Sequence, residues 1–420
     1  PYEIPVTFSN KYFYKFLLDN SIKITDNVIS WNNNSPSLDI LIKLLFGIDL
    51  NSNNHTITIN SQECRTTIPF RYKISHKENA FRELVIIHPK NQLMLIEFYD
   101  KYKDVILYYC KISPFSIRKP HKIAKFTYYK DRTHLENLAY DHEYQSVEEF
   151  NREYETLKTF FSYKEISNIY KFYESYNYHR CEKKYSKLLK FDISNCFDSI
   201  YTHTLPWALL DKETVKNNKK KSNETFGGKF DCLMQNLNYG ETNGIIIGPE
   251  FSRIFAELIL QKIDLNVMNF LRDSSNNKIP LRFKKDYEIF RYVDDFFVFY
   301  NDDTTIARIL NAYRAQLMEY KLYINESKST PPLEKPIITE ITIAKQKIAD
   351  LLKNYLNINF TDDKQSLENN EEQEKKEQKY SFYSSSNKLI TRFKTIIKET
   401  NIEYKDILNY TLACIDRKTV

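Results

Sequence analysis

The chain has 420 residues and 42% hydrophobic content, enough to bury two or three cores of ordinary domain size. Its 61 basic and 55 acidic residues leave a net charge of +6, which suits a phosphate-binding groove and an ordinary surface equally well. The six cysteines lack CxxC spacing, which argues against a zinc site or a disulfide framework. There is no apolar run of about 18 residues and no signal-peptide pattern, so we expect a soluble cytoplasmic protein without a membrane partner. Because the sequence begins with Pro1, we expect further residues before it.

Two residue types depart from ordinary usage. The 32 Tyr and 28 Phe residues exceed what a core needs, and aromatic faces are what unpaired bases and sugars stack on. A nucleotide bias toward A and T is the alternative explanation. Glycine is the sharper signal, since five of only six fall between Gly227 and Gly248. We infer that the backbone needs an unusual conformation or a close approach there.

The first 80 residues give local structure but no chemistry. The pattern predicts a helix over residues 37–46 and a strand near residues 56–60. An apolar segment follows at residues 82–88, then a helix over 92–102 and a strand over 105–109.

The basic segment at residues 113–122 comes next. Guanidinium groups bind phosphate oxygens in bidentate fashion, so Arg82 and Arg118, with Lys119 and Lys122, are candidates to hold phosphate groups. The alternative is that each is a solvated surface charge.

Ser146 and Glu149 form a capping-box pattern, which predicts a long helix reaching about residue 170. Residues 188–200 then predict a short apolar strand that delivers Asp192, with Phe197 and Asp198 on the following turn.

Thr204 and Pro206 are typical of a helix start. The lysine-rich residues 216–221 predict a solvated loop, with template contact as the alternative.

The glycine-rich stretch precedes a helix. Pro249 suits a first helical turn, and the apolar residues after it recur at helical spacing. Gly244 and Gly248 therefore lie in a loop that leads into a helix N-terminus, where exposed N–H groups can meet a nucleotide or phosphate.

Two adjacent carboxylates, Asp294 and Asp295, interrupt the apolar run at residues 288–300. The pattern predicts two short buried strands joined by a charged turn. Carboxylates are rarely set against so much apolar surface unless a cation compensates them, because burying an unpaired charge is costly. A metal is the expected compensator, and a simple polar turn is the alternative.

After this hairpin, Thr304 or Thr305 is expected to cap a helix. Residues 362–379 lack apolar periodicity and predict a flexible linker or a solvated helix. A helical segment is expected over residues 387–420.

Over about residues 80–330 the chain resembles the reverse transcriptases. Asp192 with Phe197 is similar to their first palm motif, and Gly244-x-x-x-Gly248 to the second. The stretch Tyr292-Val293-Asp294-Asp295 is similar to the third. Residues 322–328 are similar to the fourth, with Lys328 in the position proposed to protonate pyrophosphate.

The resemblance implies an α+β right-hand polymerase with fingers, palm and thumb, in which helices back an antiparallel palm sheet. We therefore expect an N-terminal extension at residues 1–80, fingers at 81–190 and a palm at 191–330 with a fingers segment inserted at about 208–240. A linker and a helical thumb or C-terminal region would follow at 331–420.

Phosphoryl transfer to a primer hydroxyl uses two divalent cations roughly 3.5–4 Å apart, so at least two carboxylates must converge. We assign Asp192 and Asp294 as the bridging ligands and Asp295 as a weaker third, because successive strand side chains point to opposite faces. The resemblance adds the backbone carbonyl of Ile193. Oxygen ligands and phosphate substrates favour Mg²⁺, two ions per site, with Mn²⁺ as an alternative.

The resemblance also implies roles for side chains around the acids. Phe197 would lie beneath the sugar of the incoming nucleotide and exclude a 2′-hydroxyl, the alternative being a plain core phenylalanine. Other expected nucleotide contacts are Arg82, Arg118, Gly248 and Tyr292, and expected template or primer contacts are Gly244, Ser252 and Arg253.

Residues 191–203, 238–244 and 248–253 are similar to the bacterial defence-associated reverse transcriptases, the abortive-infection AbiK-like and DRT groups, with DRT type 3 as one candidate. Such enzymes make DNA that helps to block phage growth. Some work with a non-coding RNA, some with a second reverse transcriptase, and some extend DNA without a template from a protein hydroxyl. The expected partners are therefore RNA or DNA, dNTPs, a non-coding RNA and a second reverse transcriptase, in a homo- or hetero-oligomer.

Ile246 and Ile247 stand where Pro and Gln are usual in the family, so the Gln contact to the template is absent or supplied elsewhere. This departure favours low-fidelity or non-templated synthesis. Two alternatives stay open: a mobile-element or cellular reverse transcriptase that copies ordinary RNA, and a palm-fold nucleic-acid-binding or assembly subunit with little catalysis.

Overall fold

A computed structural model describes residues 11–124, 160–273, 279–355 and 386–419. Shorter gaps fall at 26–27, 33–35, 48–54, 59–65, 78–79, 164–165, 167–168, 329–331 and 335–336. The chain divides into two compact units, Pro1–Pro332 and Leu333–Val420. The predicted helix between residues 146 and 160 lies outside the described residues, as does the predicted linker at 362–379.

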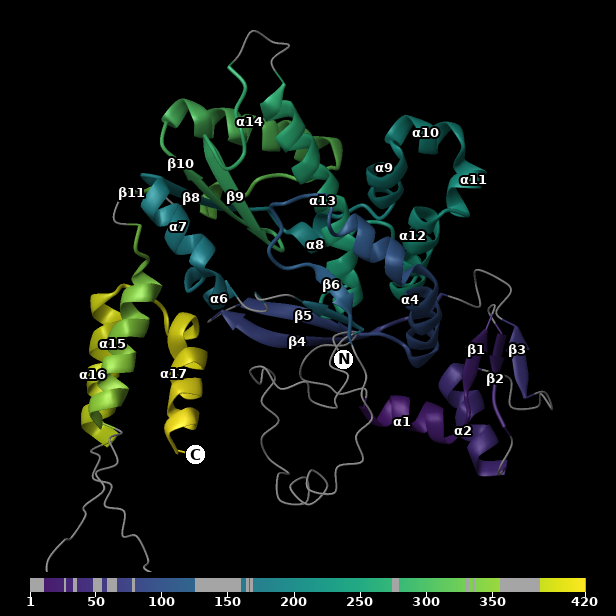
Figure 1. Ribbon diagram of the computed structural model, residues 1–420. Helices are drawn as coiled ribbons and strands as arrows, with labels where there is room; N and C mark the ends of the chain where they lie inside the picture. Colours follow the sequence, from purple (N-terminus) through teal and green to yellow (C-terminus); the bar gives the residue numbers. More distant parts are fainter. Residues whose placement is uncertain are drawn as a thin grey trace, which may run out of the picture. The chain divides into compact units, whose positions relative to one another are not determined.

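A central antiparallel sheet organises the first unit (Figure 1). Strand β10 (Asp295–Tyr300) lies between β8 (Lys187–Asp192) and β9 (Tyr287–Tyr292). The predicted hairpin with two buried strands is thus confirmed. All three strands are rich in aromatic and aliphatic residues, which pack well on a pleated, two-sided surface.

One face of this sheet packs on two long helices, α13 (Glu250–Arg272) and α14 (Asp303–Glu319). Phe191 of β8 stacks on Phe296 of β10 with ring centres 4.7 Å apart, and Tyr313 of α14 packs edge-on against both rings. Helix α14 begins one residue before the predicted cap, because the Asp302 side chain accepts the Thr305 N–H. The expectation of a threonine cap was therefore wrong.

The opposite face is covered by α6 (Ile169–Tyr173) and α7 (Tyr176–Lys184). Phe172 lies 5.1 Å from Phe297, and Tyr178 lies 5.5 Å from Phe299, measured between ring centres. Because both faces are buried in this way, the strands read as near-continuous apolar runs and do not alternate with polar residues.

Helix α4 (Pro89–Tyr109) corrects one prediction. Residues 105–109 were expected as a strand, but they form the last turns of this 21-residue helix. The helix continues through residues 105–109 despite their β propensity, because no helix-breaking residue separates these residues from the preceding turns. Ile106 is also buried in the main core.

Two short hairpins complete the region around α4. Strand β4 (Phe70–Lys77) pairs with β5 (Ala80–Ile86), and β6 (Pro120–Ile123) pairs with β7 (Phe161–Tyr163). Phe161 was expected to lie on a helix, and this pairing shows that the expectation was wrong.

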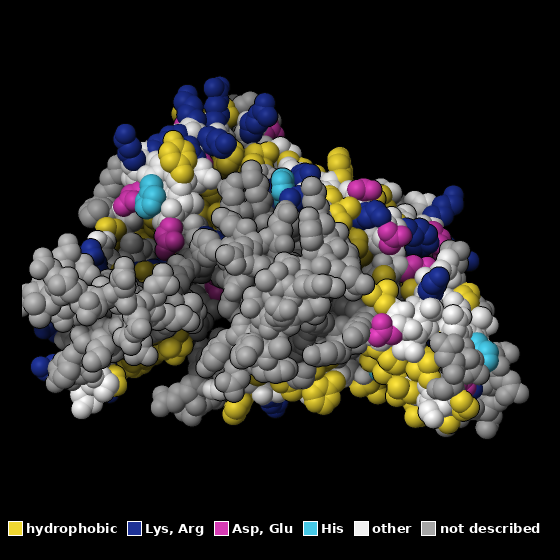
Figure 2. Space-filling view, turned by 60° about the horizontal axis from the view of Figure 1, so that its bottom comes forward, with side chains coloured by type: hydrophobic (Ala, Val, Ile, Leu, Met, Phe, Trp, Pro, Cys, Tyr) yellow, Lys and Arg dark blue, Asp and Glu magenta, His cyan; other side chains and the backbone are white. Residues whose placement is uncertain are grey.

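The N-terminal elements form a small core of their own. They are α1 (Lys11–Asp19), β1 (Lys23–Thr25), β2 (Val28–Ser30), α2 (Pro36–Phe46) and β3 (Thr56–Thr58), which confirms the predicted helix and strand. Trp31, Ile42 and Phe46 are buried together. Leu18, Ile40, Leu41 and Leu44 remain exposed, and hydrophobic side chains gather at the lower right of Figure 2, where this region lies.

A run of short helices follows β8: α8 (Cys196–Ser199), α9 (Thr204–Leu210), α10 (Lys212–Asn217), α11 (Lys219–Asn223) and α12 (Phe226–Leu237). The helix start predicted at Thr204 is confirmed. The loop predicted at residues 216–221 is wrong, since α10 and α11 occupy most of it, although the lysines there are exposed as expected. Charge alone does not separate a solvated loop from a solvated helix.

The second unit contains β11 (Leu333–Glu334), α15 (Glu340–Tyr355), α16 (Ser386–Glu399) and α17 (Tyr404–Thr419). Ile348, Ile396 and Ile407 form its buried centre. The helical prediction for residues 387–420 is confirmed, with a break between two helices. In the described ranges of both units, every helix is too short or too polar to span a bilayer.

We predict that Gly228→Ala lowers the free energy of unfolding by about 1–3 kcal/mol, the usual cost of overpacking. A Cβ at Gly228 would collide with the Ser222 carbonyl and lie 2.6 Å from Asn223 Cα, and both are backbone atoms that cannot turn aside. Gly227→Ala is the control, because its new Cβ would meet its nearest neighbours at 3.2 Å. Denaturant titration of the two variants measures the difference, and equal losses would refute the steric explanation.

Candidate active site

Three aspartates meet at one end of the central sheet. The pairing of β8 with β10 sets Asp192 directly opposite Asp295, and the pairing of β10 with β9 sets Asp295 opposite Tyr292. Directly opposed residues of antiparallel strands point to the same face. Tyr292, Asp295 and Asp192 therefore form a row across the sheet, with Asp294 in the turn beside it.

The surroundings distinguish the three carboxylates. Burial raises the pKa of the Cys196 thiol on α8, and the charges of Asp294 and Asp192 raise it further, so both acids lie near α8. On α6, burial and the charge of Asp295 raise the pKa of Tyr173. Asp295 is exposed, whereas Asp192 and Asp294 are half-buried. Asp192 is therefore a neighbour of both other acids: it lies opposite Asp295 in the sheet and, with Asp294, near Cys196.

The turn between β9 and β10 consists of Val293 and Asp294. Val293 has φ +57°, a left-handed value that β-branched residues rarely adopt. A positive φ at the first central residue is typical of a type II′ hairpin turn, where glycine is favoured. The turn is tied to β8, because the Ile193 N–H donates to the Asp294 carbonyl over 3.3 Å.

The residues fit a cation, though not as a closed cage. Within the described ranges, no group of three or more His, Cys, Asp or Glu side chains is placed to hold a metal ion by itself. Asp192 and Asp294 both lie near Cys196, and carboxylate and carbonyl oxygens are the ligands that Mg²⁺ prefers. Such a partial set suits a metal that also binds its substrate's phosphate oxygens.

The glycine loop is docked against the segment that follows Asp192. The Gly244 N–H donates to the Ile200 carbonyl over 2.9 Å, and the Ile245 N–H donates to the Phe197 carbonyl over 2.8 Å. Gly244 has φ +83°, and a Cβ there would lie 3.1 Å from the Asp198 carbonyl oxygen, so glycine is required. This contact fixes the half-buried Phe197 beside the acids.

Gly248 also has a left-handed φ, +125°, and lies two residues before α13. The predicted loop leading into a helix N-terminus is confirmed. Pro249 is the residue that immediately precedes the helix.

Arg118 extends the row of acids with a cation. Its guanidinium carbon lies 5.2 Å from the Tyr163 ring centre and 5.4 Å from that of Tyr292. Cation–π contacts of this kind contribute about 0.5–2 kcal/mol each. Tyr163 was missed by sequence reasoning, because only the β6–β7 pairing brings it near Arg118.

A small hollow of about 10 Å³ lies beside the turn, roughly the space of one water molecule. Arg118, Arg253, Val293 and Glu250 are among its lining residues. Glu250 is 3% exposed, and burial raises the pKa of its carboxyl while the nearby Arg253 and Arg118 oppose the rise. Sequence reasoning also missed Glu250, although an acid at the start of an apolar helix was a usable signal.

Several predicted residues lie elsewhere or face inward. Arg82 is exposed on β5. The Lys119 ammonium donates to the Ser113 carbonyl over 2.8 Å. Ser252 is completely buried in α13, which does not favour the expected direct contact with template or primer, and that contact stays a prediction.

Lys328 ends the short 3-10 helix η1 (Glu326–Lys328), which packs beside β8. Its side chain lies outside the described atoms.

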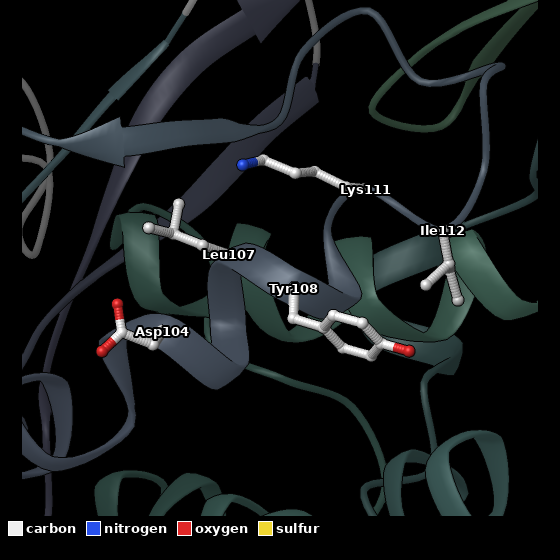
Figure 3. Close-up of a pocket in the computed structure, with 5 residues that line it drawn as sticks. All are labelled: Asp104, Leu107, Tyr108, Lys111 and Ile112. Atoms are coloured by element: carbon white, nitrogen blue, oxygen red, sulfur yellow. The ribbon is translucent and has the colours of Figure 1, made fainter.

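A larger hollow of about 490 Å³ lies at the end of α4 (Figure 3). Asp104, Leu107 and Tyr108 come from the helix, and Lys111 and Ile112 from the residues just after it. Its lining is mainly apolar, with one carboxylate and one ammonium group, and it offers no pair of acids. We assign it no chemistry.

Three aspartates at one end of a sheet, beside a glycine loop, are the arrangement that the sequence predicts for a polymerase palm. Residues 145–348 match the family model described as "Reverse transcriptase (RNA-dependent DNA polymerase)". Over these residues the chain is similar to the reverse transcriptase domain, and its fold is the predicted α+β right-hand polymerase fold.

Two telomerases are among the similar solved structures. Apo telomerase from Candida tropicalis, truncated from its C-terminal domain, is 12% identical with a TM-score of 0.37, and the match covers 64% of this chain and 50% of that one. Telomerase from Candida albicans in complex with a TWJ fragment of telomeric RNA is 12% identical with a TM-score of 0.34, covering 84% and 56%. The chain thus spans little more than half the length of these proteins. No curated protein matches it.

We predict that Asp192→Asn stabilises the chain in EDTA by about 0.2–1 kcal/mol, because it removes the repulsion between directly opposed carboxylates. The same variant should lose the rise in melting temperature that MgCl₂ gives the parent, since a cation that binds only the native state stabilises it. Thermal unfolding with EDTA and with MgCl₂ measures both effects. Asp303→Asn is the control, because Asp303 pairs with Lys187 at the far end of β8. A magnesium-dependent shift that survives in Asp192→Asn would show that the cation binds elsewhere.

Proposed function

We propose that this chain is a reverse transcriptase-type DNA polymerase that adds dNTPs to a primer hydroxyl in bacterial defence against phage. The observation that carries the proposal is the row Arg118, Tyr292, Asp295 and Asp192, with Asp294 in the turn beside it. It sets a phosphate-binding cation next to metal-binding acids on one face of a rigid sheet. Phosphoryl transfer depends mainly on such positioning and charge.

The roles follow from the placement of the side chains. Asp192 and Asp294 would hold the divalent cations, with Asp295 and the Ile193 carbonyl as further oxygen ligands. When bound, such ions lower the pKa of the attacking hydroxyl and neutralise charge on the triphosphate. Arg118 holds a phosphate group, and its two tyrosine contacts keep the guanidinium in place. Lys328 is assigned as the acid for pyrophosphate.

In this assignment, residues 81–190 are the fingers and residues 191–330 the palm, with the helices near 208–240 as an inserted fingers segment. Residues 331–420 supply the linker and thumb. RNA or DNA is the expected template and primer, and Gly244 and Arg253 are the proposed contacts to it.

The defence role is supported by the glycine loop. Ile246 is buried in the main core, and the Ile247 carbonyl accepts the Val85 N–H over 2.9 Å. Where the family usually has a glutamine that reaches the template, this chain has side chains and backbone engaged in packing. Such a loop fits restricted or non-templated synthesis, alone or with a non-coding RNA or a second reverse transcriptase.

The decisive experiment incubates the purified chain with Mg²⁺ and each dNTP in turn, with and without co-purified RNA, and sequences any DNA. A restricted or repetitive product that Asp294→Asn abolishes is expected, because the variant removes one metal-binding carboxylate. Asp303→Asn is the control and should leave the product unchanged. Efficient copying of any primed RNA with all four dNTPs would instead indicate an ordinary reverse transcriptase. No product in any condition would favour an assembly subunit.

We predict that Phe197→Ala admits ribonucleotides, because the half-buried ring, whose backbone carbonyl accepts the Ile245 N–H, would block a 2′-hydroxyl. The ratio of dNTP to NTP incorporation should fall at least about tenfold, on the order of 1.4 kcal/mol of discrimination. Phe197→Tyr keeps the bulk and should keep the ratio. Equal ratios in Phe197→Ala and the parent would make Phe197 a plain core residue.

A further inference from the structure

Arg291 is a charged residue in the interior of the sheet. It lies on β9 between Phe290 and Tyr292, and its side chain is 0% exposed. A guanidinium does not lose its proton in proteins, and burying it is costly unless it is paired and fully hydrogen-bonded. The partners of this one side chain therefore explain why it is tolerated.

Two acids of α13 supply the compensating charge. Arg291 Nη1 lies 2.8 Å from Glu257 Oε2 and Nη2 lies 3.2 Å from Glu257 Oε1, so this pair is bidentate. Nε lies 2.8 Å from Asp264 Oδ2. Glu257 is 5% exposed and Asp264 0%, so both ion pairs are sheltered from water. Bidentate, charge-assisted contacts of this kind fix the orientation of the guanidinium plane.

These acids are themselves anchored. Asp264 accepts the Tyr313 hydroxyl of α14 over 3.2 Å, and Glu257 accepts the Gln261 amide over 2.7 Å. Gln261 in turn accepts the Ser113 N–H over 2.6 Å. The network therefore joins β9, two helices and the segment that precedes Arg118.

The guanidinium also reaches the turn. Nη1 donates to the Val293 carbonyl over 2.9 Å. Val293 is the residue with φ +57°, and a β-branched residue held in this region is strained. Such a conformation persists only when neighbouring contacts impose it, and the bond from Arg291 is a direct one.

The backbone of Arg291 positions the other side of the site. Its N–H donates to the Phe115 carbonyl over 2.8 Å, and its carbonyl accepts the Ile117 N–H over 2.9 Å. These two bonds align the segment that ends at Arg118 alongside β9. One residue thus sets both the turn that carries Asp294 and the segment that carries the phosphate-binding cation.

We propose that Arg291 is a positioning residue that holds the strained Val293–Asp294 turn in its metal-binding conformation, an inference that rests on the proposed function. It touches neither nucleotide nor metal. Arg291→Lys keeps the charge but cannot reach Glu257, Asp264 and the Val293 carbonyl together.

Arg180 offers a matched control. It forms an ion pair with the buried Glu288 on the opposite face of the same strand, without contact to the turn. Arg180→Lys should therefore lower stability as Arg291→Lys does, without altering the site.

The experiment compares both lysine variants with the parent by thermal unfolding, by Mn²⁺ titration followed by electron paramagnetic resonance, and by kcat for nucleotide addition. For Arg291→Lys we expect the Mn²⁺ dissociation constant to rise about tenfold or more and kcat to fall similarly, the usual effect of losing a residue that orients metal ligands. For Arg180→Lys both should stay within about twofold while the melting temperature falls.

A rescue separates strain from general damage. Glycine adopts a left-handed φ without strain, so Val293→Gly should recover most of the Mn²⁺ affinity lost in Arg291→Lys. It should not restore the melting temperature of Arg180→Lys. If Arg291→Lys does not fold, Glu257→Gln is the alternative variant, because it weakens the ion pair between Glu257 and Arg291 Nη1. It should raise the Mn²⁺ dissociation constant severalfold.

The outcomes distinguish the two proposals. Unchanged Mn²⁺ affinity in Arg291→Lys, or in Glu257→Gln where that variant is used, overturns the positioning role even if the parent makes DNA. An additional loss of affinity on Val293→Gly also overturns it. If the parent protein binds Mn²⁺ but makes no DNA, the proposed function is overturned. The comparison of Mn²⁺ affinities still tests the positioning role of Arg291 in that case. A parent that binds no Mn²⁺ overturns both.

Discussion

Asp192 and Asp295 face each other across the pairing of β8 with β10, and this opposition of like charges depends on the strand register. A slip of one residue would turn every side chain of a strand to the other face. The aromatic layers forbid it, because Phe296 must meet Phe191 and Tyr313 while Phe297 must meet Phe172. The hydrophobic cores on both faces thus hold the carboxylates together against their repulsion.

The sequence predicts the parts of this arrangement that are local. The acids at residues 294 and 295 interrupt an apolar run, and that contrast alone predicts a charged turn between buried strands, although Asp295 is the first residue of β10 and only Asp294 lies in the turn. The glycines are equally readable, since Gly244 has a left-handed φ and a carbonyl where its side chain would be. The strand expected at residues 105–109 is wrong, because β-branched and aromatic residues are also compatible with the last turns of a long helix, of which only Ile106 is buried here.

The sequence does not predict which residues from distant elements meet in space. Arg118, Tyr163 and Tyr292 meet only because β6 pairs with β7 and the segment before Arg118 lies along β9. Ser252 faces the core, since the face that a residue of α13 presents depends on how the helix packs. Arg291 is different, because a cation in an apolar strand needs buried partners by the same argument as the acids. Glu257 and Asp264 interrupt the preceding apolar helix at helical spacing.

The conformation of Val293 shows how the turn that carries Asp294 is held in place. A type II′ turn favours glycine, yet this chain keeps valine there, so the conformation depends on its tethers to Arg291 and Ile193. The neighbouring hollow holds about one water molecule, too little for any phosphate group. The cation–π contacts of the half-buried Arg118 are weak, whereas the ion pairs that hold the turn are buried and strong.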